Sequence, residues 1–327
     1  MAGEGGSAGP ALPDVTTEGS TPQGEATQSV AAPDITMAAE VSLAVAAKAS
    51  GENFPVALKV LPRTWREHLS ALYGFARLTD DIGDEPLPGL DLATTDPEVY
   101  LQARLRLLDE LQQDVSRLYD GARPELDIVR ALGPTVSACG IPRKPFDDLI
   151  AANRQDQLVK RYETYDDLVK YCELSANPVG QVVLYIVGKA TPERLSLSDN
   201  ICTALQIVEH SQDVAEDLGN GRIYLPREDL ERFGVTEGDL ARPSASDDVK
   251  RLMDFQVRRA RQLLDEGAPL AGMLSGAARL AISGYIAGGR AALKAIEDAG
   301  YDVLATTPKP GKAATLTGMV SCYLKGR

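Results

Sequence analysis

Apolar residues recur at intervals of three and four along most of this chain. The segment 98–120 carries the pattern at Leu101, Leu105, Leu108, Leu111, Val115 and Leu118. This spacing places the apolar side chains on one face of an α-helix. Alternation of apolar and polar residues, which is typical of half-buried strands, is nearly absent. We therefore predict an all-α fold, with helices at 38–50, 64–83, 98–120, 124–139, 143–160, 165–188, 192–219, 246–267, 269–300 and 312–325.

Glycine and proline cluster between the predicted helices, at Gly121–Pro124, Gly140–Pro142 and Gly219–Gly221. These residues favour turns and are unfavourable inside helices. Two longer stretches, 85–97 and 306–312, have the same loop-like composition. We interpret all five segments as connections within or beside one helical domain.

The chain has 327 residues, of which 44% are apolar, so it can bury a large core. We assign the domain to 38–305, and a linker with a short helix to 306–327. The first 37 residues are rich in Gly, Ala, Pro, Ser, Thr and acidic residues and contain no Lys or Arg. Because such a segment buries too little apolar surface to offset its ordering entropy, 1–37 is predicted to be a disordered acidic tail.

Charge and cysteine usage exclude several functions. The net charge of −13 argues against nucleic acid as a partner. The four cysteines show no Cys-x-x-Cys spacing and there are two histidines, so we expect reduced thiols and no zinc site. No apolar run reaches the ~18 residues that span a bilayer, and the N-terminus lacks the features of a signal peptide. These features predict a cytoplasmic protein, and peripheral membrane contact stays open because a lipid substrate could require it.

An acidic cluster, Asp80-Asp81-x-x-Asp84, lies at the end of the predicted helix 64–83. At 100° per residue, these three side chains fall with Tyr73 and Arg77 in one arc of about 100°. The neighbouring residues are apolar, so the helix is expected to be largely buried. It therefore presents a polar stripe where an ordinary core helix would present leucine.

A second acidic cluster, Asp213-x-x-Glu216-Asp217, lies in the predicted helix 192–219. The same helical arithmetic groups Asp213 and Asp217 with Gln206 and His210. Two distant helices thus carry similar polar stripes, and each contains an Asp-x-x-x-Asp pair whose members stand one turn apart.

Two such pairs facing each other across a bundle would repel unless cations lay between them. Mg²⁺ is commonly held by one or two carboxylates, with water and substrate phosphate as the other ligands. We therefore predict a Mg²⁺-dependent enzyme acting on a diphosphate ester. A solvated acidic face on each helix is the alternative interpretation.

Two further segments suggest a ligand site. Arg222 follows the second cluster directly, in Gly221–Pro226, and could pair with the carboxylates or with a leaving diphosphate. A surface turn is the alternative there. Pro178 lies inside the predicted helix 165–188 and cannot donate to the carbonyl of Leu174, which predicts a kink or a break between two short helices.

These segments resemble the signatures of the squalene/phytoene synthase family. The first signature corresponds to Leu72–Asp84, the second to Gln212–Asp217 with Gly221–Pro226, and the helix between them to Tyr171–Gly180. The resemblance extends from about residue 50 to about residue 300. It implies an all-α, single-domain isoprenoid synthase fold (class I terpenoid synthase), in which the helical bundle surrounds a central cavity with Mg²⁺ at its mouth.

Within the family, Glu52–Ala57 and Ser175–Gly180 are most similar to the hydroxysqualene synthase branch of bacterial hopanoid pathways. The resemblance implies an isoprenoid diphosphate substrate, with presqualene diphosphate and water converted to hydroxysqualene and pyrophosphate. It also leaves open functional coupling to other enzymes of the squalene pathway. The chain could act as a monomer or a homodimer.

Two departures from the family pattern affect the diphosphate chemistry. Members that condense two prenyl diphosphates usually carry Ser and Lys where this chain has Gly51, Glu52 and Asn53. The family also commonly has Asn and Arg where this chain has Glu209 and Gln212. Both exchanges fit a substrate that bears one diphosphate.

The resemblance also implies roles for single residues. Asp80, Asp84, Asp213 and Asp217 are expected to hold Mg²⁺, with Asp81 and Glu216 supporting them. Arg77 is expected to neutralise the departing diphosphate, and Tyr73 and Tyr171 to stabilise the carbocation through their ring faces. The predicted substrate-binding residues are Asn53, Phe54, Asn177, Val179, Gln206, Glu209, His210, Arg222 and Tyr224. Among these, His210, Glu209, Gln206 and Asn177 are the candidates for holding the water that quenches the cation.

Three other functions stay open at this point. Head-to-head condensation of two prenyl diphosphates, to presqualene diphosphate, squalene or phytoene, would use the same carboxylates. An all-α nucleotide pyrophosphohydrolase would also place acidic pairs on helices, without a deep apolar cavity. A catalytically silent helical binding protein is the third alternative.

Overall fold

Helices make up nearly all of the regular structure. The computed structural model describes residues 61–91 and 93–326, and the side chains of these residues except 312–314. The described residues belong to one compact unit, Pro33–Arg327. Its helices are α3 (Arg63–Asp84), α4 (Pro97–Tyr119), α5 (Asp127–Cys139), α6 (Lys144–Leu158), α7 (Tyr165–Ser175), α8 (Asn177–Ile186), α9 (Pro192–Gln212), α10 (Val214–Gly219), α11 (Arg227–Phe233), α12 (Glu237–Leu240), α13 (Asp247–Gly267), the 3₁₀ helix η1 (Ala268–Met273), α14 (Gly276–Asp298) and α15 (Lys312–Lys325).

The long helices agree closely with the all-α prediction, and among the described residues β-structure is limited to an isolated bridge between Arg161 and Ile223. The expected loops 85–97 and 306–312 are irregular up to residues 96 and 311 where they are described, and their last residues, Pro97 and Lys312, begin α4 and α15. The predicted tail 1–37 and helix 38–50 lie outside the described residues, as do Asn53 and Phe54.

Three long predicted helices are each divided in the structure. The predicted helix 165–188 breaks at Ala176, so Pro178 lies in the first turn of α8, where a missing N–H is tolerated. The predicted helix 192–219 is interrupted at Asp213, and 269–300 becomes η1 followed by α14. The short helices α11 and α12 were not predicted, because they are too short to show helical periodicity.

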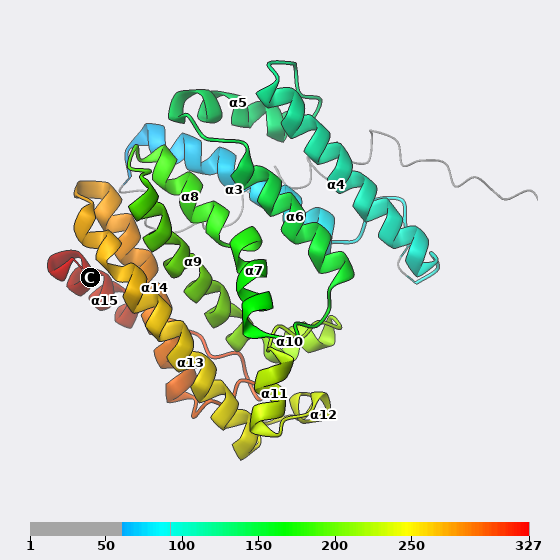
Figure 1. The fold of residues 1–327 in the computed structure, drawn as a ribbon, viewed down its shortest axis with the longest axis vertical. Helices are drawn as coiled ribbons and strands as arrows, with labels where there is room; N and C mark the ends of the chain where they lie inside the picture. Colours follow the sequence, from blue (N-terminus) through cyan, green and yellow to red (C-terminus); the bar gives the residue numbers. More distant parts are fainter. Residues whose placement is uncertain (1–60, 92, 327) are drawn as a thin grey trace, which may run out of the picture. The chain divides into compact units, whose positions relative to one another are not determined.

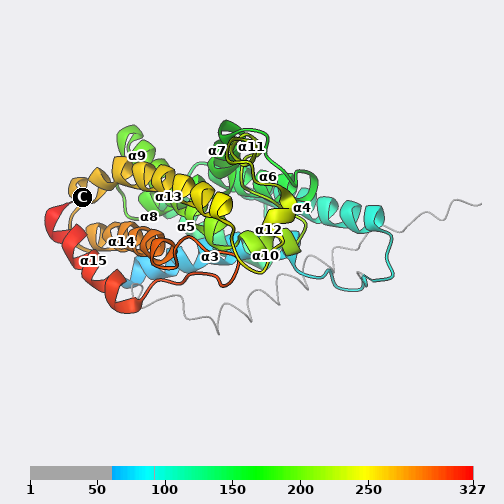
Figure 2. The same cartoon turned by 90° about the horizontal axis from the view of Figure 1, so that it is seen from below.

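Two hydrophobic cores hold the helices together. In one, α3, α4, α5, α6 and α8 pack around Phe75, Leu107 and Phe146. In the other, α7, α9, α13 and α14 pack around residues such as Ile207 and Val257. Figures 1 and 2 show these two groups, and α8 of the first packs against α7 of the second. The site described below lies where the two groups meet.

The C-terminal helix α15 packs along α14, and Cys322 is buried in their shared core. All four cysteines are free thiols, and Cys172 is also buried. Within the part of the chain that the structure describes, no helix is both long enough and apolar enough to cross a membrane.

Candidate active site

A polar cavity of about 280 Å³ lies between α3, α6, α7, α9 and α10. It brings together two aspartates from each acidic cluster, Asp80 and Asp84 from α3 with Asp213 and Asp217 from the second cluster. Its other described lining residues are Leu149, Ala152, Asn153, Asp156, Tyr171, Ser175, Gln206, Glu209, His210, Arg222 and Tyr224. The structure therefore brings the Asp-x-x-x-Asp pairs of the two predicted helices to the same cavity.

On the α3 side, polar partners surround the aspartates. The Asn153 side-chain amide donates to Asp80 Oδ1 at 3.2 Å. The Arg222 guanidinium pairs with Asp84, with Nη2 and Oδ1 2.8 Å apart. Pairing with the carboxylates was one of the two roles that the sequence suggested for Arg222. The pKa of the Asp80 carboxyl is raised to about 6. The main cause is desolvation by the surrounding protein, and repulsion from Asp84 adds to it.

Asp81 and Arg77 lie outside the cavity lining. Asp81 is buried, at 5% exposure, and Arg77 Nε contacts its Oδ1 at 2.7 Å one helical turn away. Arg77 also lies 3.8 Å from Glu85. The charges of Arg77 and Asp81 therefore balance each other outside the cavity. Tyr73, further up α3, is half-buried and lines neither this cavity nor the apolar one described below.

On the other side, α9 ends at Gln212 and α10 begins at Val214, with Asp213 between them at φ −103° and ψ 20°. Backbone hydrogen bonds bridge the interruption, since Asp213 N–H donates to Glu209 and Asp217 N–H donates to Asp213. Burial, with repulsion from Glu216 and Asp217, raises the pKa of Asp213. Glu216 is exposed and does not line the cavity.

The segment after α10 is fixed by backbone pairing with the end of α6. Ile223 N–H donates to the Lys160 carbonyl at 3.0 Å, and Ile223 forms a parallel bridge with Arg161. This pairing directs the side chains on either side of Ile223, Arg222 and Tyr224, to the cavity.

Part of the cavity wall consists of aromatic rings that surround one buried carboxylate, that of Asp156. Asp156 accepts hydrogen bonds from the hydroxyls of Tyr171, at 2.6 Å, and Tyr224, at 2.9 Å. Burial raises the pKa of Asp156, while these phenols and Arg222 oppose the rise. The His210 ring stacks on Tyr224, with ring centres 3.7 Å apart, and His210 Nδ1 lies 3.8 Å from Asp217 Oδ2.

Sequence reasoning missed Asp156 and its neighbour Asn153. A signal was present, because Leu149, Ala152, Asn153 and Asp156 have the i, i+3, i+4, i+7 spacing of a buried helical face. Two polar side chains on such a face indicate either an internal hydrogen-bond network or a site, and here they form both.

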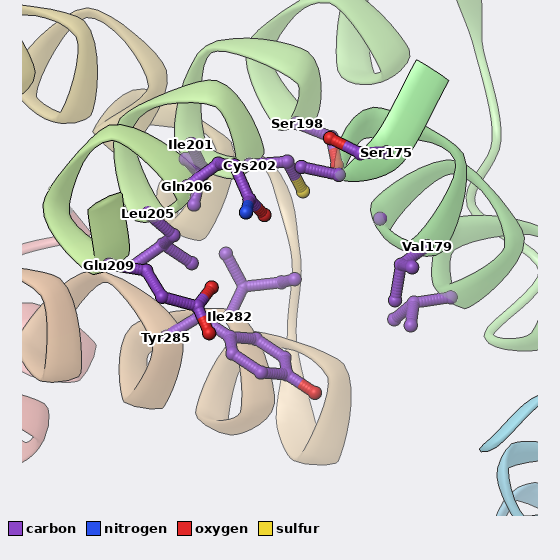
Figure 3. A pocket seen from close by; sticks show the side chains of 13 residues that line it. Ser175, Val179, Ser198, Ile201, Cys202, Leu205, Gln206, Glu209, Ile282 and Tyr285 are labelled. Carbon is purple, nitrogen blue, oxygen red and sulfur yellow. The ribbon is translucent and has the colours of Figure 1, made fainter. Parts of the chain in front are cut away.

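A second, apolar cavity of about 230 Å³ lies beside the first, between α7, α8, α9 and α14 (Figure 3). Its described lining consists of Ser175, Ala176, Val179, Gly180, Val183, Ser198, Ile201, Cys202, Leu205, Gln206, Glu209, Ile282 and Tyr285. Gly180 lets α8 approach α9 closely, because a Cβ there would lie 2.5 Å from both Cys202 Sγ and Ser198 Oγ. Three residues line both cavities, so the two hollows meet.

The structure does not bring Asn177 to either hollow. Its Oδ1 accepts a hydrogen bond from Thr203 Oγ1 at 3.0 Å, and it lines a separate polar cavity with Lys144 and Asp199. Val179, one residue beyond Pro178, lines the apolar cavity. Of the described residues predicted to bind substrate, Gln206, Glu209, His210, Arg222 and Tyr224 line the polar cavity.

The donor set of the polar cavity fits Mg²⁺. Hard carboxylate oxygens line it from both sides, and the pKa of Asp80 and Asp213 is raised, first by desolvation and then by repulsion from neighbouring carboxylates. Among the described residues, no three carboxylate, histidine or cysteine side chains converge on one ion. Such convergence is not required, because Mg²⁺ is often held by one or two carboxylates together with water and substrate phosphate.

The helical architecture is that of class I terpenoid synthases. A solved dehydrosqualene synthase, 23% identical, has the same fold, with a TM-score of 0.74 over 89% of this chain and 99% of that chain. The squalene synthase HpnC from Alicyclobacillus acidocaldarius is 38% identical, with a TM-score of 0.70 over 80% of this chain and 95% of that chain.

Similar sequences identify the family within the class I terpenoid synthases to which the chain belongs. The squalene/phytoene synthase family model matches residues 47–315, so the chain belongs to this family. A hydroxysqualene synthase from Rhodopseudomonas palustris is 33% identical over 221 residues, which cover 67% of this chain and 70% of that protein. A 15-cis-phytoene synthase from Synechocystis is 31% identical over 227 residues, covering 66% of this chain and 64% of that protein.

Proposed function

We propose that this protein converts presqualene diphosphate and water to hydroxysqualene and pyrophosphate, with Mg²⁺ as cofactor. The observation that carries the proposal is the junction of the two cavities. One holds four aspartates suited to a metal-bound diphosphate, and the adjoining one presents a mainly apolar surface suited to a prenyl chain. The hydroxysqualene synthases among the relatives support the choice of reaction.

Asp80, Asp84, Asp213 and Asp217 are the residues that would hold the metal. Mg²⁺ bound there would supply positive charge to the leaving diphosphate. Arg222 lines the same cavity, and its planar guanidinium, already directed to Asp84, suits the oxygens of a bound phosphate. We therefore assign to Arg222 the leaving-group role expected of Arg77, which is engaged by Asp81.

The aromatic part of the cavity wall suits the cation that remains after the diphosphate departs. Tyr171, Tyr224 and His210 pack against one another, and Asp156 fixes both phenol hydroxyls. Ring faces held in this way can stabilise positive charge by about 1–2 kcal/mol each when water is excluded. Their orientation is set before substrate arrives, which is the condition for electrostatic stabilisation of a developing charge.

The charge balance of the site favours a substrate with one diphosphate. Of the described residues that line the polar cavity, Arg222 is the Arg or Lys present, and Glu209 adds a further carboxylate to the wall. Two bound diphosphates would bring more negative charge than this lining can readily balance.

Head-to-head condensation of two prenyl diphosphates is the second candidate. The phytoene synthases among the relatives favour it, and it would use the same aspartates. The two reactions are distinguished by their substrates. Purified protein with Mg²⁺ in ¹⁸O-labelled water is given presqualene diphosphate in one reaction and farnesyl or geranylgeranyl diphosphate in the other.

A C30 alcohol carrying ¹⁸O, formed from presqualene diphosphate without NADPH, is the expected result. Turnover of farnesyl or geranylgeranyl diphosphate alone, with no alcohol formed from presqualene diphosphate, would replace the proposed reaction by condensation.

A further inference from the structure

Three polar side chains line both cavities: Ser175 at the end of α7, and Gln206 and Glu209 on α9. They therefore lie at the boundary between the diphosphate region and the prenyl region. Under the proposed function, the carbocation forms at this boundary, because the bond that breaks joins the prenyl chain to the diphosphate.

Glu209 is unusual among them because it is a carboxylate beside an apolar hollow. Its carboxylate has no hydrogen-bond or ion-pair partner among the described residues, and it is the one Asp or Glu in the described lining of the apolar cavity. An ionised carboxylate only accepts hydrogen bonds, so of the three boundary side chains Glu209 is the one that can take a proton from a bound water.

The other two side chains also offer unused hydrogen-bonding groups. The Ser175 hydroxyl is buried and has no partner. The Gln206 amide nitrogen lies 3.2 Å from His210 Nε2, and the Gln206 carbonyl oxygen makes no hydrogen bond to the described residues. Figure 3 shows the polar ends of Gln206 and Glu209 projecting into the cavity. Together these groups provide the two to four polar contacts that a bound water requires.

The remaining two candidates for holding the quenching water are engaged elsewhere. Asn177 is bonded to Thr203 and lines a different cavity. His210 is buried, with one ring nitrogen beside Gln206 and the other directed to Asp217. Among the described residues, Ser175, Gln206 and Glu209 are the ones that line both cavities, and each has a polar group that is not engaged by another side chain.

We propose that Ser175, Gln206 and Glu209 hold the water that captures the carbocation, and that Glu209 accepts its proton. This inference rests on the proposed function. The carbon–oxygen bond to the diphosphate breaks, and its electron pair leaves with pyrophosphate. After the cation rearranges, a lone pair of the water oxygen forms the new carbon–oxygen bond. One water proton passes to the Glu209 carboxylate, which returns it to solvent, and no oxidant or reductant is consumed.

The ratio of the two possible products tests this assignment. The cation either is captured by water, which gives the alcohol, or loses a proton, which gives a hydrocarbon. Glu209→Gln, Ser175→Ala and wild type are compared on presqualene diphosphate with Mg²⁺ in ¹⁸O water, without NADPH. Pyrophosphate release reports ionisation, and the ratio of labelled alcohol to hydrocarbon reports capture. Glu193→Gln, the same change at an exposed position on α9, is the matched control.

We expect Glu209→Gln to lower the alcohol-to-hydrocarbon ratio by about tenfold or more while pyrophosphate release falls by less than about threefold. Ser175→Ala should lower the ratio by about threefold, as loss of one hydrogen bond predicts. Glu209→Asp, which keeps the base, should recover part of the alcohol. Ser175→Ala also provides an independent result if Glu209→Gln does not fold, as judged by circular dichroism.

An unchanged ratio in both Glu209→Gln and Ser175→Ala would overturn the assignment. So would a parallel loss of pyrophosphate release and alcohol with no change in ratio, because Glu209 would then act on ionisation. Absence of alcohol from wild type is a separate outcome, which contradicts the proposed function itself.

Discussion

The two acidic clusters face one cavity, but the protein neutralises them differently. On α3, Asp80 is bonded by Asn153, Asp81 by Arg77 and Asp84 by Arg222. In the second cluster, no Arg or Lys forms a recorded ion pair with Asp213, Glu216 or Asp217 among the described residues. The ionic contact there is His210 at 3.8 Å from Asp217.

This difference suggests a division of labour between the clusters. The α3 cluster is held in place by the protein, on an uninterrupted helix. The second cluster lies at a helix interruption and retains more unbalanced charge, so its geometry should depend more on a bound cation. The following predictions test that comparison, from the largest expected effect to the smallest.

Removing one aspartate from either cluster should nearly abolish turnover. Asp80→Asn and Asp213→Asn should each lower the rate of pyrophosphate release from presqualene diphosphate by roughly 10²–10³-fold, because under the proposed function both clusters act on the same leaving group. A Mg²⁺ titration of each variant then separates the clusters. Asp213→Asn should need the higher Mg²⁺ concentration, and equal Mg²⁺ requirements would contradict the division of labour.

Mg²⁺ together with inorganic pyrophosphate should stabilise the wild-type fold. At about 100 times the dissociation constant, a ligand that binds only the folded state adds about 2.7 kcal/mol to the free energy of unfolding. Thermal melting with Mg²⁺ and pyrophosphate, against EDTA, measures this effect. The increment should be smaller in Asp213→Asn than in Asp80→Asn, and the reverse order would assign the dependence on the cation to α3.

Asp81→Asn should destabilise the fold and affect metal binding little. The change leaves Arg77 without its buried counter-ion, at a cost of about 2 kcal/mol in the free energy of unfolding. Urea denaturation measures the loss. If Asp81→Asn instead removed the stabilisation by Mg²⁺ and pyrophosphate, Asp81 would belong with the metal-binding residues, as the sequence had predicted.

Arg222→Lys should weaken substrate binding and retain the fold. Lysine keeps the charge but loses the planar fork that contacts Asp84 and suits phosphate oxygens. We expect KM for presqualene diphosphate to rise about tenfold, which corresponds to about 1.4 kcal/mol. Steady-state kinetics checks this, with Arg227→Lys, at an exposed site on α11, as control. An unchanged KM would remove Arg222 from the diphosphate site.

Glu216→Gln should have the smallest effect. Its side chain is exposed and outside the cavity lining, so turnover should stay within about twofold and the free energy of unfolding within about 0.5 kcal/mol. The assays used for Asp213→Asn apply without change. A large loss of turnover would restore the supporting role predicted from the sequence.

The sequence predicted most of the fold because its long helices are strongly periodic. The predicted helix 64–83 corresponds to α3, and 312–325 has the same bounds as α15. Pro178 marked the division between α7 and α8. The interruption at Asp213 carries no such mark, since neither Gly nor Pro lies there, and the backbone hydrogen bonds on either side continue across it.

The site was predictable where a motif repeats and less so where it depends on tertiary contacts. The two Asp-x-x-x-Asp pairs were enough to indicate a shared cavity. Arg77 and Asp81 have the i, i+4 spacing of a helical ion pair, but helical arithmetic could not show that this pair lies outside the cavity that Asp80 and Asp84 line. Nor could it show that Asn177 faces Thr203, or that Asp156 joins two tyrosines that lie 53 residues apart in the chain, at positions 171 and 224.

The close approach of α8 and α9 at Gly180 has a consequence for protein engineering. A single methyl group at this position would collide with Cys202 and Ser198. The width of the apolar cavity therefore depends partly on the lack of a side chain at Gly180. Attempts to enlarge this cavity for a longer chain of the proposed substrate should therefore begin by trimming both Cys202 and Ser198. Gly180 itself becomes substitutable only after that room has been made.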